Sequence, residues 1–566
     1  MDTIPEVTPM PSTQTAQPYA QPYATHEVDN QPPPLAPYDA AQDPALLEGL
    51  NREGAGWAEQ DVRRFGQRAG SPEAQEWAEQ ANVHEPVLRT HDRWGHRIDE
   101  VEFHPSWHHL MRTAVAEGGG GAAWADERPG AHVARYAGAL VWGHTEAGHG
   151  CPLAMTYAVV PALRAEPQLA SVYEPLLTSR VYDPELRVPT EKRGILAGMG
   201  MTEKQGGSDV RTNTTVATPT GEDGLYTLRG HKWFTSAPMC DVFLVLAQAP
   251  GGLSCFLVPR ILPDGTRNTF RIQRLKDKLG NRSNASSEPE FDGTLAWRVG
   301  PEGHGVKTII EMVNCTRLDC VSGSASLMRK ALVEAGHHVA YRSAFGARLI
   351  DQPLMRNVIA DLAVESEAAT TLTLRLAGAA DRSIRGDERE RSFRRIATAL
   401  GKYWVTKRAP AFTAEALECL GGNGYVEDSG MPRLYREAPL NSVWEGSGNV
   451  NALDVLRVLG KEPAAATALL DELALAKGAD RRLDAAVARI GTELSDLADI
   501  QTRARYLVEL MALTLQGSLL VRHAPAAVAD AFCATRLGDA GGLAFGTLPA
   551  SADLTGIIDR SQAVPR

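Results

Sequence analysis

The spacing of apolar residues changes twice along the chain, and this order of patterns constrains the fold more than any single motif. From Asp43 to about Leu186 apolar residues recur at spacings of three and four, which is typical of helices. Between about Gly194 and Gly300 short apolar runs are separated by Gly, Pro, Asp and Asn turns, as in strands. Helical spacing returns after Gly305. We therefore predict an α+β fold in which a β domain is inserted between two helical regions.

Individual elements follow from the same pattern. We expect a helix start at Asp43 and Pro44 as N-cap and first residue, and helices at 101–116, 131–142, 306–348, 353–384, 392–419 and through much of 453–540. We expect strands at 226–229, 242–248, 253–258 and 270–275. Because one hydrophobic core stops growing near about 250 to 300 residues, a chain of 566 residues requires several domains. The predicted divisions are a tail at 1–40, a helical N-terminal domain at 41–193, a β domain at 194–302, a helical domain at 303–456 and a helical extension at 457–566.

Composition limits the classes of protein to be considered. Residues 1–40 are rich in Pro, Gln, Thr and Ala and cannot bury enough apolar surface to offset the entropy of ordering, so we predict a disordered tail. No run approaches the roughly 20 apolar residues of a spanning helix, and no signal peptide is recognisable, so we expect a cytoplasmic protein without a membrane partner. The seven cysteines form no C-x-x-C pair, which predicts core thiols and no metal site. A net charge of −11 argues against a polycation on nucleic acid but does not exclude a local basic patch.

A glycine-rich segment opens the β domain. Residues 198–209 read Gly-Met-Gly-Met-Thr-Glu-Lys-Gln-Gly-Gly-Ser-Asp. Flexible glycines beside hydroxyl groups and backbone donors suit an anionic or polar cofactor. The segment is not a Rossmann fingerprint, because Glu203 occupies the place of the third glycine. From the residues alone, an ordinary turn before a strand explains the segment equally well.

This segment resembles the flavin-binding loop of the acyl-CoA dehydrogenase superfamily, and its wording resembles the AidB-like, alkylation-response branch of that family. The resemblance extends over residues 105–548. It implies an acyl-CoA dehydrogenase-like fold with a helical N-terminal domain, a central β-barrel-like domain and a helical C-terminal domain with a further helical extension. It also implies an FAD cofactor, contacted in this loop by Met199, Met201, Thr202, Gln205, Gly206, Gly207 and Ser208.

A second segment, Gly-His-Lys-Trp-Phe-Thr-Ser at 230–236, resembles the family's strand whose tryptophan packs beside the flavin. The resemblance implies that Trp233, Phe234 and Thr235 contact FAD. Without the first segment, a core aromatic residue would be the better interpretation of Trp233.

Two further segments resemble parts of the family that bind FAD across a subunit boundary. Tyr-Arg-Ser-Ala-Phe-Gly at 341–346 is similar to the family's R-x-x-F-G segment, which implies that Arg342 and Phe345 reach the FAD pyrophosphate of a neighbouring subunit. Gly421 and Gly422 belong to a glycine-rich turn similar to the one the family places at the same dinucleotide. The resemblance therefore implies a homo-oligomer, a dimer or tetramer. Considered alone, Arg342 would be a solvated charge and the glycines a helix C-cap.

Glu445 lies in Val-Trp-Glu-Gly-Ser-Gly-Asn at 443–449, which matches the position of the catalytic base in many acyl-CoA dehydrogenases. That chemistry requires a carboxylate, because a positioned base removes the α-proton of a thioester as the β-hydride passes to the flavin. In a closed cleft the pKa of such a glutamate rises towards neutrality. A capping or salt-bridged glutamate is the alternative. The resemblance also places Val443, Trp444, Ser447 and Asn449 along the adenine and ribose side of FAD, and Arg317 against an acyl-CoA thioester.

The AidB-like branch is associated with double-stranded DNA, which the resemblance assigns to a basic face of the C-terminal helices. Arg457 and Arg536 match positions of DNA-contacting arginines, and Arg482 and Arg489 share a helix face beside Arg481. Acidic and basic residues nearly balance from 460 to 566, so no basic domain is evident. Each arginine alone is better explained as a solvated or ion-paired surface residue.

Three functions remain open on these grounds. The first is an FAD-containing protein of the AidB type that binds double-stranded DNA in the response to alkylation damage and retains weak acyl-CoA dehydrogenase chemistry. The second is a metabolic dehydrogenase of short or branched-chain acyl-CoA with no DNA role. The third is a structural flavoprotein without turnover. The helical extension beyond Leu456 favours the first, because a minimal dehydrogenase would end soon after that residue.

Overall fold

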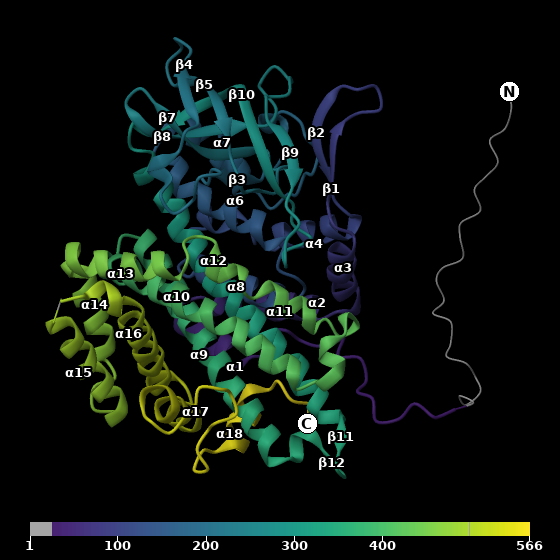
Figure 1. Cartoon of the computed structure of the whole chain (residues 1–566), viewed down its shortest axis with the longest axis vertical. Helices are drawn as coiled ribbons and strands as arrows, with labels where there is room; N and C mark the ends of the chain where they lie inside the picture. Colours follow the sequence, from purple (N-terminus) through teal and green to yellow (C-terminus); the bar gives the residue numbers. More distant parts are fainter. Residues whose placement is uncertain (1–24, 497, 566) are drawn as a thin grey trace.

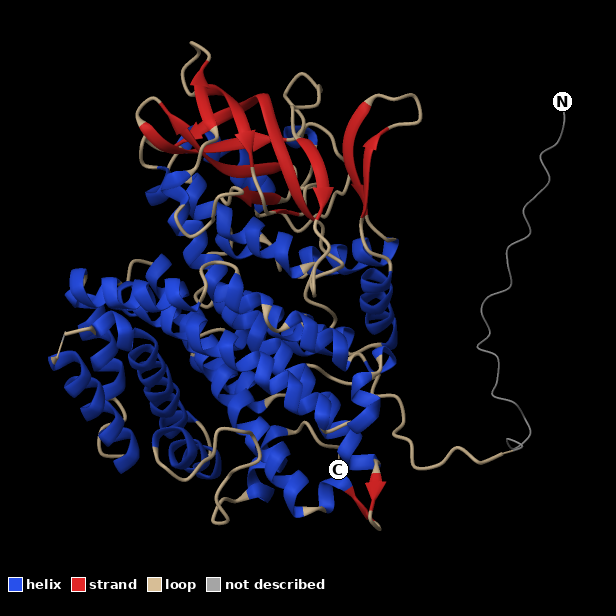
Figure 2. Ribbon diagram, in the orientation of Figure 1, coloured by secondary structure: helices blue, strands red, loops and turns tan. Residues whose placement is uncertain are grey.

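The structure, a computed structural model, describes residues 25–496 and 498–565. Strands gather at one end of the molecule, a layer of N-terminal helices lies against them, and a large helical bundle forms the other end (Figure 1, Figure 2). Helical, then β, then helical is also the order of these parts along the chain. The predicted α+β architecture is therefore confirmed.

From residue 25 onward, seven α-helices precede the β domain: α1 (Pro44–Arg52), α2 (Glu59–Ala69), α3 (Pro72–Val83), α4 (Pro105–Ala116), α5 (Ala131–Trp142), α6 (Gly150–Leu163) and α7 (Pro167–Leu177). The first begins as predicted, because the Asp43 carboxylate accepts a hydrogen bond from the Ala45 N–H at 3.0 Å and Pro44 occupies the first position. α5 has the predicted bounds.

A β-hairpin interrupts these helices where a helix from 101 to 116 was expected. Its strands are β1 (Val87–His91) and β2 (Arg97–Glu102), paired antiparallel. In β2 burial alternates along the strand, with Asp99 and Val101 buried and their neighbours more exposed, which is a period of two. Helix α4 begins only at Pro105, after the N-cap residue His104. The prediction was wrong for its first residues because a helical spacing was read across this boundary.

The β domain is a closed ring of strands with three further strands beside it. Its members are β3 (Ala197–Gly200), β4 (Val216–Pro219), β5 (Leu225–His231), β6 (Thr235–Ser236), β7 (Val242–Ala249), β8 (Gly252–Pro259), β9 (Arg271–Leu275) and β10 (Ser286–Val299). β7 pairs with β4, β4 with β5, β5 with β10, β10 with β8, and β8 again with β7. This closure is the barrel-like arrangement that the resemblance implied. The four predicted strands are found as β5, β7, β8 and β9.

Strand β10 has 14 residues and was not predicted. Its sequence contains Pro289, Asp292 and Gly293, which weaken a strand pattern, and the register shifts between Asp292 and Thr294. It nevertheless pairs with β5, β6, β8 and β9.

Three long helices form the centre of the bundle: α8 (Gly305–Tyr341), α9 (Pro353–Ile384) and α10 (Glu388–Glu418). The boundary at the Gly303 turn and the bounds of α9 agree with the predictions. The helix expected to reach 348 ends at Tyr341, because a short hairpin follows, made of β11 (Ser343–Ala344) and β12 (Ala347–Arg348). Its tip needs left-handed backbone at Phe345 and Gly346, with φ of 53° and 79°.

The remaining helices of the described chain are α11 (Met431–Glu437), α12 (Leu440–Val443), α13 (Gly448–Lys461), α14 (Pro463–Ala474), α15 (Arg481–Ser495), α16 (Ile500–His523), α17 (Ala526–Phe532) and α18 (Leu554–Ser561). Of these, α13 to α17 lie along one side of the centre (Figure 1). The predicted division at residue 456 falls inside α13. α16 is long and apolar enough to cross a membrane by composition, but 72% of its apolar window is buried in the protein, as in a core helix.

The predicted disordered tail lies partly outside the described residues, which begin at 25. From about residue 30 the prediction is wrong. This segment has no helix or strand, yet it lies along α8: the Pro33 carbonyl oxygen accepts from His337 Nε2 at 2.7 Å and the Tyr38 hydroxyl accepts from Lys330 Nζ at 3.0 Å. Ala40 and Ala41 are buried. Proline-rich composition did not reveal these anchoring contacts.

Candidate functional site

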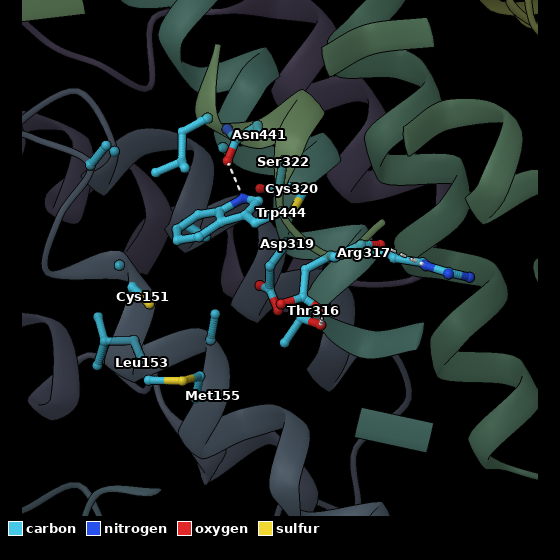
Figure 3. A pocket seen from close by; sticks show the side chains of 18 of the residues that line it. Cys151, Leu153, Met155, Thr316, Arg317, Asp319, Cys320, Ser322, Asn441 and Trp444 are labelled. Atoms are coloured by element: carbon cyan, nitrogen blue, oxygen red, sulfur yellow. Dashed lines mark hydrogen bonds between the residues drawn. The ribbon is translucent and has the colours of Figure 1, made fainter. Parts of the chain in front are cut away.

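A cavity of about 1330 Å³ lies where the β domain, α6, α8 and the turn after α12 meet. Figure 3 shows its centre, with Thr316 and Asp319 of α8 and Trp444 of the turn on one side and Leu153 and Met155 of α6 on the other. Many of the predicted site residues line it: Met199, Met201, Thr202, Gly207, Ser208, Phe234, Arg317, Val443, Trp444, Glu445, Ser447 and Arg457. Segments far apart in the sequence are thus brought to one cavity.

The turn that carries Glu445 is held by two side chains from neighbouring helices. Glu445 has a left-handed backbone, with φ of 56°, which is strained for a residue with a side chain. Lys402 Nζ on α10 donates to the carbonyl oxygens of Trp444 and Gly446 at 2.8 and 2.7 Å. Arg317 Nε on α8 donates to the Glu445 carbonyl oxygen at 3.1 Å. These donors keep the carboxylate at the cavity wall in spite of the strain.

The Glu445 carboxylate has a sparse set of partners. Oε2 accepts a hydrogen bond from Thr316 Oγ1 at 2.8 Å, and within the described chain this is the only hydrogen bond to the carboxylate. Burial raises the pKa of Glu445 above its usual range, and the Thr316 hydrogen bond and the charges of Arg317 and Lys402 oppose that rise. A half-buried carboxylate that lines the cavity, accepts a single hydrogen bond and is more basic than usual can accept a proton from a ligand there.

The glycine-rich loop is fixed by a buried ion pair rather than by the cavity. Glu203 accepts from Lys232 Nζ at 2.6 Å, and both side chains are 0% exposed. Gln205 Nε2 donates to the other Glu203 oxygen at 2.8 Å. Gln205 and Gly206 do not line the cavity. In this chain, therefore, Gln205 supports the loop from behind, whereas Thr202 and Ser208 line the cavity.

Trp233 and Thr235 differ from expectation in a similar way. Neither lines the cavity, although Phe234 and Ser236 beside them do. The Trp233 ring lies 3.2 Å from Lys276 Nζ, which makes a cation–π contact, with Lys204 and Arg274 farther away. Thr235 is buried, and its Oγ1 has no hydrogen-bond partner among the residues described. An unpartnered hydroxyl next to a cavity suits a polar ligand, so FAD contact at Thr235 stays a prediction.

Four residues predicted to bind FAD lie on the surface of the single chain. Phe345 is 100% exposed at the tip of the β11–β12 hairpin, and Gly421 and Gly422 are exposed at the end of α10. Arg342 Nη1 donates to the Asn30 carbonyl oxygen at 2.5 Å. None of the four lines the cavity. The predicted role across a subunit boundary is not tested by one chain.

Arg317 braces the site from behind. Its side chain is 8% exposed and its Nη1 lies 2.8 Å from Asp454 Oδ2. Together with the hydrogen bond to the Glu445 carbonyl oxygen, this engages Nε and Nη1 of the guanidinium in holding the turn. Contact with a thioester substrate stays a prediction for Arg317.

The arginines predicted to contact DNA fall into two groups. The prediction that Arg536 contacts DNA is wrong. Its side chain is 11% exposed and pairs with Asp361 and with Glu365 Oε2 at 3.0 Å, so its charge is neutralised inside the bundle. Arg482 is 24% exposed and pairs with Asp480 and Asp530. Arg457 is 55% exposed and pairs with Asp454, whereas Arg489 is exposed on α15 with no ion-pair partner in the described ranges.

A site for a phosphate group lies beside the cavity. The 14-residue helix α13 begins at Gly448, and its N-cap Ser447 makes no side-chain hydrogen bond to the first N–H groups. A Cβ added at Gly448 would lie 3.0 Å from Lys407 Nζ and 3.3 Å from Arg505 Nη2, so two cations meet the helix N-terminus. Uncapped N–H groups and adjacent cations suit the pyrophosphate of a dinucleotide. Asn449, predicted on this side of FAD, is exposed here and does not line the cavity.

Several residues of the site were missed at the level of sequence. Thr316, Lys402, Lys407 and Arg505 lie on helices α8, α10 and α16, and no short motif marks them. Thr316 was the most accessible of these, since it directly precedes Arg317. The others required knowledge of which helices pack around the Glu445 turn.

Comparison with known proteins agrees with this geometry. Residues 198–294 match the acyl-CoA dehydrogenase middle domain, residues 303–460 the acyl-CoA dehydrogenase C-terminal domain, and residues 30–184 the N-terminal domain of adaptive response protein AidB. The last match includes part of the segment that was predicted to be a disordered tail without a counterpart.

Individual relatives extend over most of the chain. AidB of Escherichia coli (strain K12) is 46% identical over 92% of this chain and 96% of its own length. The structure of Caenorhabditis elegans ACDH-11 in complex with C11-CoA superposes with a TM-score of 0.82 at 28% identity, covering 92% of this chain and 95% of that one. An acyl-CoA dehydrogenase complexed with FAD from Bacillus anthracis shares the fold, with a TM-score of 0.60 at 19% identity over 82% of each chain.

The family uses FAD to oxidise CH–CH groups, and the cavity, its carboxylate and the adjacent phosphate site fit that cofactor. The chain is thus an FAD-dependent oxidoreductase of the acyl-CoA dehydrogenase family, on its AidB-like branch.

Proposed function

We propose that this protein oxidises the acyl group of an acyl-CoA thioester between its α and β carbons, with Glu445 as the base. The observation that carries the proposal is the Glu445 carboxylate at the cavity wall, with one hydrogen bond and a pKa raised by burial. FAD, when bound, supplies the two-electron acceptor for this oxidation. The binding of C11-CoA by ACDH-11 of Caenorhabditis elegans supports a thioester as the ligand.

The residues of the chain then have distinct tasks. Glu445 accepts the α-proton at Oε1 or Oε2. Thr316, Arg317 and Lys402 hold the turn so that the carboxylate does not swing away. The apolar side chains of Leu153 and Met155 exclude water from the acyl group, which keeps the proton transfer inside the protein.

Replacing the base tests the assignment. Glu445→Gln removes the proton acceptor and keeps the size of the side chain, so the rate of flavin reduction by acyl-CoA should fall by about 10²- to 10⁴-fold while FAD stays bound. Stopped-flow bleaching of the flavin absorbance measures the rate, and the yellow colour after gel filtration measures retention. Glu437→Gln is the matched control, because Glu437 lines the same cavity and its carboxylate accepts from the Asn281 N–H at 2.8 Å. Unchanged turnover in Glu445→Gln, or an equal loss in the control, would contradict the role of Glu445.

The proposal includes an oligomer in which the FAD site is shared. The exposure of Phe345, Gly421 and Gly422 supports a partner subunit at this surface. Light scattering should give a dimer or tetramer, and Phe345→Asp should lower both the mass and the FAD content. A monomer that retains FAD would remove this part of the proposal.

Binding of double-stranded DNA in the response to alkylation damage is a second, narrower proposal. It is supported by the match to the adaptive response protein and by the exposure of Arg457 on α13 and of Arg481 and Arg489 on α15. Arg536 and Arg482 are not part of it, since each is paired with two carboxylates.

A salt series tests this second role. The variant Arg457→Ala with Arg489→Ala should weaken duplex binding and lower the slope of log K against log salt by about 0.9 for each lost phosphate contact. Fluorescence anisotropy with labelled duplex measures both. Arg63→Ala is the control, since Arg63 is an exposed arginine on α2, paired with Glu59. A slope equal to that of the unmodified protein would remove Arg457 and Arg489 from the DNA surface.

A further inference from the structure

A stripe of polar side chains runs along the face of α8 that lines the cavity. Thr316, Asp319 and Ser322 follow one another at intervals of three residues, which places them on one side of the helix on successive turns. Thr316 already bonds to Glu445. Asp319 and Ser322 have no role in the proposed oxidation of acyl-CoA.

Asp319 has one oxygen in use and one without a partner. Oδ1 lies 2.6 Å from Nη1 of Arg135 on α5, and the Asp319 side chain is 13% exposed. Oδ2 has no hydrogen-bond partner among the described residues. Burial raises the pKa of Asp319, and Arg135 opposes the rise. A buried carboxylate oxygen without a donor is costly, so a ligand that supplies a donor is favoured.

Ser322 repeats this situation one turn farther along α8. The residue is 2% exposed, and its Oγ has no partner in the part of the chain that the structure describes. A helical serine commonly donates to the carbonyl oxygen four residues earlier, and Ser322 does not. Two residues that line the cavity on consecutive turns of α8 therefore each carry a buried polar atom without a partner among the described residues.

The part of the wall opposite Thr316 and Asp319 carries the apolar side chains Leu153 and Met155 (Figure 3). Figure 3 shows Leu153 and Met155 of α6 across the cavity from Thr316 and Asp319. Around Thr316, Asp319 and Ser322 the α8 wall is thus polar, whereas Leu153 and Met155 make the facing part of α6 apolar (Figure 3). A wholly apolar acyl chain would satisfy one wall and leave Asp319 and Ser322 without partners.

The direction of α8 places these groups beyond the base. Val306 and Ile310, near the start of α8, line the cavity and are partly exposed, whereas the helix is largely buried from Met312 onward. A ligand that enters at the exposed end passes Thr316 and Glu445 before it reaches Asp319 and Ser322. In a thioester held with its α carbon at Glu445, the part next to these groups is the distal acyl chain.

We propose that the substrate is an acyl thioester with a hydroxyl group on the acyl chain beyond the β carbon, bound by Asp319 and Ser322. The hydroxyl group donates to Asp319 Oδ2 and accepts from Ser322 Oγ. This inference names the substrate class of the proposed function and rests on it. Asp319 and Ser322 are specificity-determining residues and take no part in the proton transfer.

Binding of unreactive analogues tests the inference apart from turnover. Hexyl-CoA thioether and its 4-, 5- and 6-hydroxy derivatives are titrated into the FAD-loaded protein by calorimetry. A hydrogen bond to a charged group predicts that one hydroxyl position tightens binding by about 10- to 100-fold. Asp319→Leu with Arg135→Met removes both charges together, so that no buried ion is left unpaired, and should abolish the preference.

A second, milder variant covers the case in which the double variant fails to fold. Ser322→Ala removes only the Oγ atom and should reduce the same preference by about 3- to 10-fold. The inference is overturned if no hydroxyl position binds more tightly than the parent thioether, or if the preference survives in both variants. Flavin bleaching by the matching hydroxyacyl-CoA is measured in parallel. A preference that depends on Asp319 without any bleaching would mean that the proposed oxidation is wrong while the ligand class holds.

Discussion

Two glutamates, a fully buried one in the β domain and a half-buried one in the turn after α12, show opposite uses of the same side chain. Glu203 accepts from Lys232 Nζ at 2.6 Å, from the Thr214 N–H and hydroxyl at 2.7 and 2.9 Å, and from the Thr215 N–H at 3.1 Å. Among the described residues the Glu445 carboxylate accepts one hydrogen bond, from the Thr316 hydroxyl. Lys232 holds the pKa of Glu203 well below its usual range, whereas burial raises that of Glu445.

The difference separates a structural charge from a reactive one. Because the folded pKa of Glu203 is lowered, its contribution to stability is present above the unfolded pKa and lost only as the pH falls through the folded value. Glu445 differs: its raised pKa makes the carboxylate a stronger base than an ordinary glutamate towards a proton of the ligand. The number and charge of the donors around each carboxylate produce this contrast.

The largest expected effect comes from breaking the buried ion pair between Glu203 and Lys232. Lys232→Met leaves Glu203 buried without its cation and should lower the free energy of unfolding by about 3 to 5 kcal/mol. Urea denaturation followed by far-UV circular dichroism measures this. The double variant Lys232→Met with Glu203→Gln should recover much of the loss. A single variant as stable as the parent protein would show that the ion pair does not hold the glycine-rich loop.

A smaller effect is expected from removing a hydrogen bond donor that holds the Glu445 turn. Lys402→Met removes the donors to the Trp444 and Gly446 carbonyl oxygens and lets the strained Glu445 backbone relax. A misplacement of about 1 Å costs roughly 10²-fold in rate, so kcat/KM for acyl-CoA should fall by up to that factor. Steady-state kinetics with a dye acceptor measures it, and Lys402→Arg should restore part of the rate. Full activity in Lys402→Met would show that Lys402 is not required to position the Glu445 turn.

The smallest effect refines the pKa of the base. The acidic limb of kcat/KM against pH reports the deprotonation of Glu445 and should lie above the ordinary glutamate value of 4.5. Thr316→Val removes the hydrogen bond that favours the carboxylate, so the limb should move upward by about one pH unit. Thr316→Ser retains the hydroxyl and should leave the limb in place. A limb that moves to lower pH in Thr316→Val would show that the Thr316 hydrogen bond raises, and does not lower, the pKa of Glu445.

Much of the architecture was predictable because it rests on local patterns. Helix α9 begins at Pro353, a proline at the first position, and its apolar periodicity continues to Ile384, so both ends were read correctly. Strand β10 was missed because its stability comes from four partner strands rather than from its own residues. The Pro-rich segment near Tyr38 was misread for the same reason: its order depends on Lys330, about 290 positions away.

The residues of the candidate site also divide into those marked by local sequence motifs and those that depend on distant contacts. Glu445, Thr202 and Ser208 could be found because they lie in motifs that stand together in the sequence. Arg536 could not be judged, since its neutralisation by Asp361 and Glu365 is a contact between distant helices. Asp319 and Ser322 carried no motif, and only the cavity shows that their oxygens lack partners.

The ring of strands in the β domain has a consequence for the chain during its synthesis. β10 is the last strand of the ring and joins β5 to β8. Until residues 286–299 have left the ribosome, the edges of β5 and β8 that later pair with β10 are open to other chains. A nascent chain that stalls before Ser286 is therefore expected to aggregate or to require a chaperone, whereas one that has passed Val299 can close its own barrel.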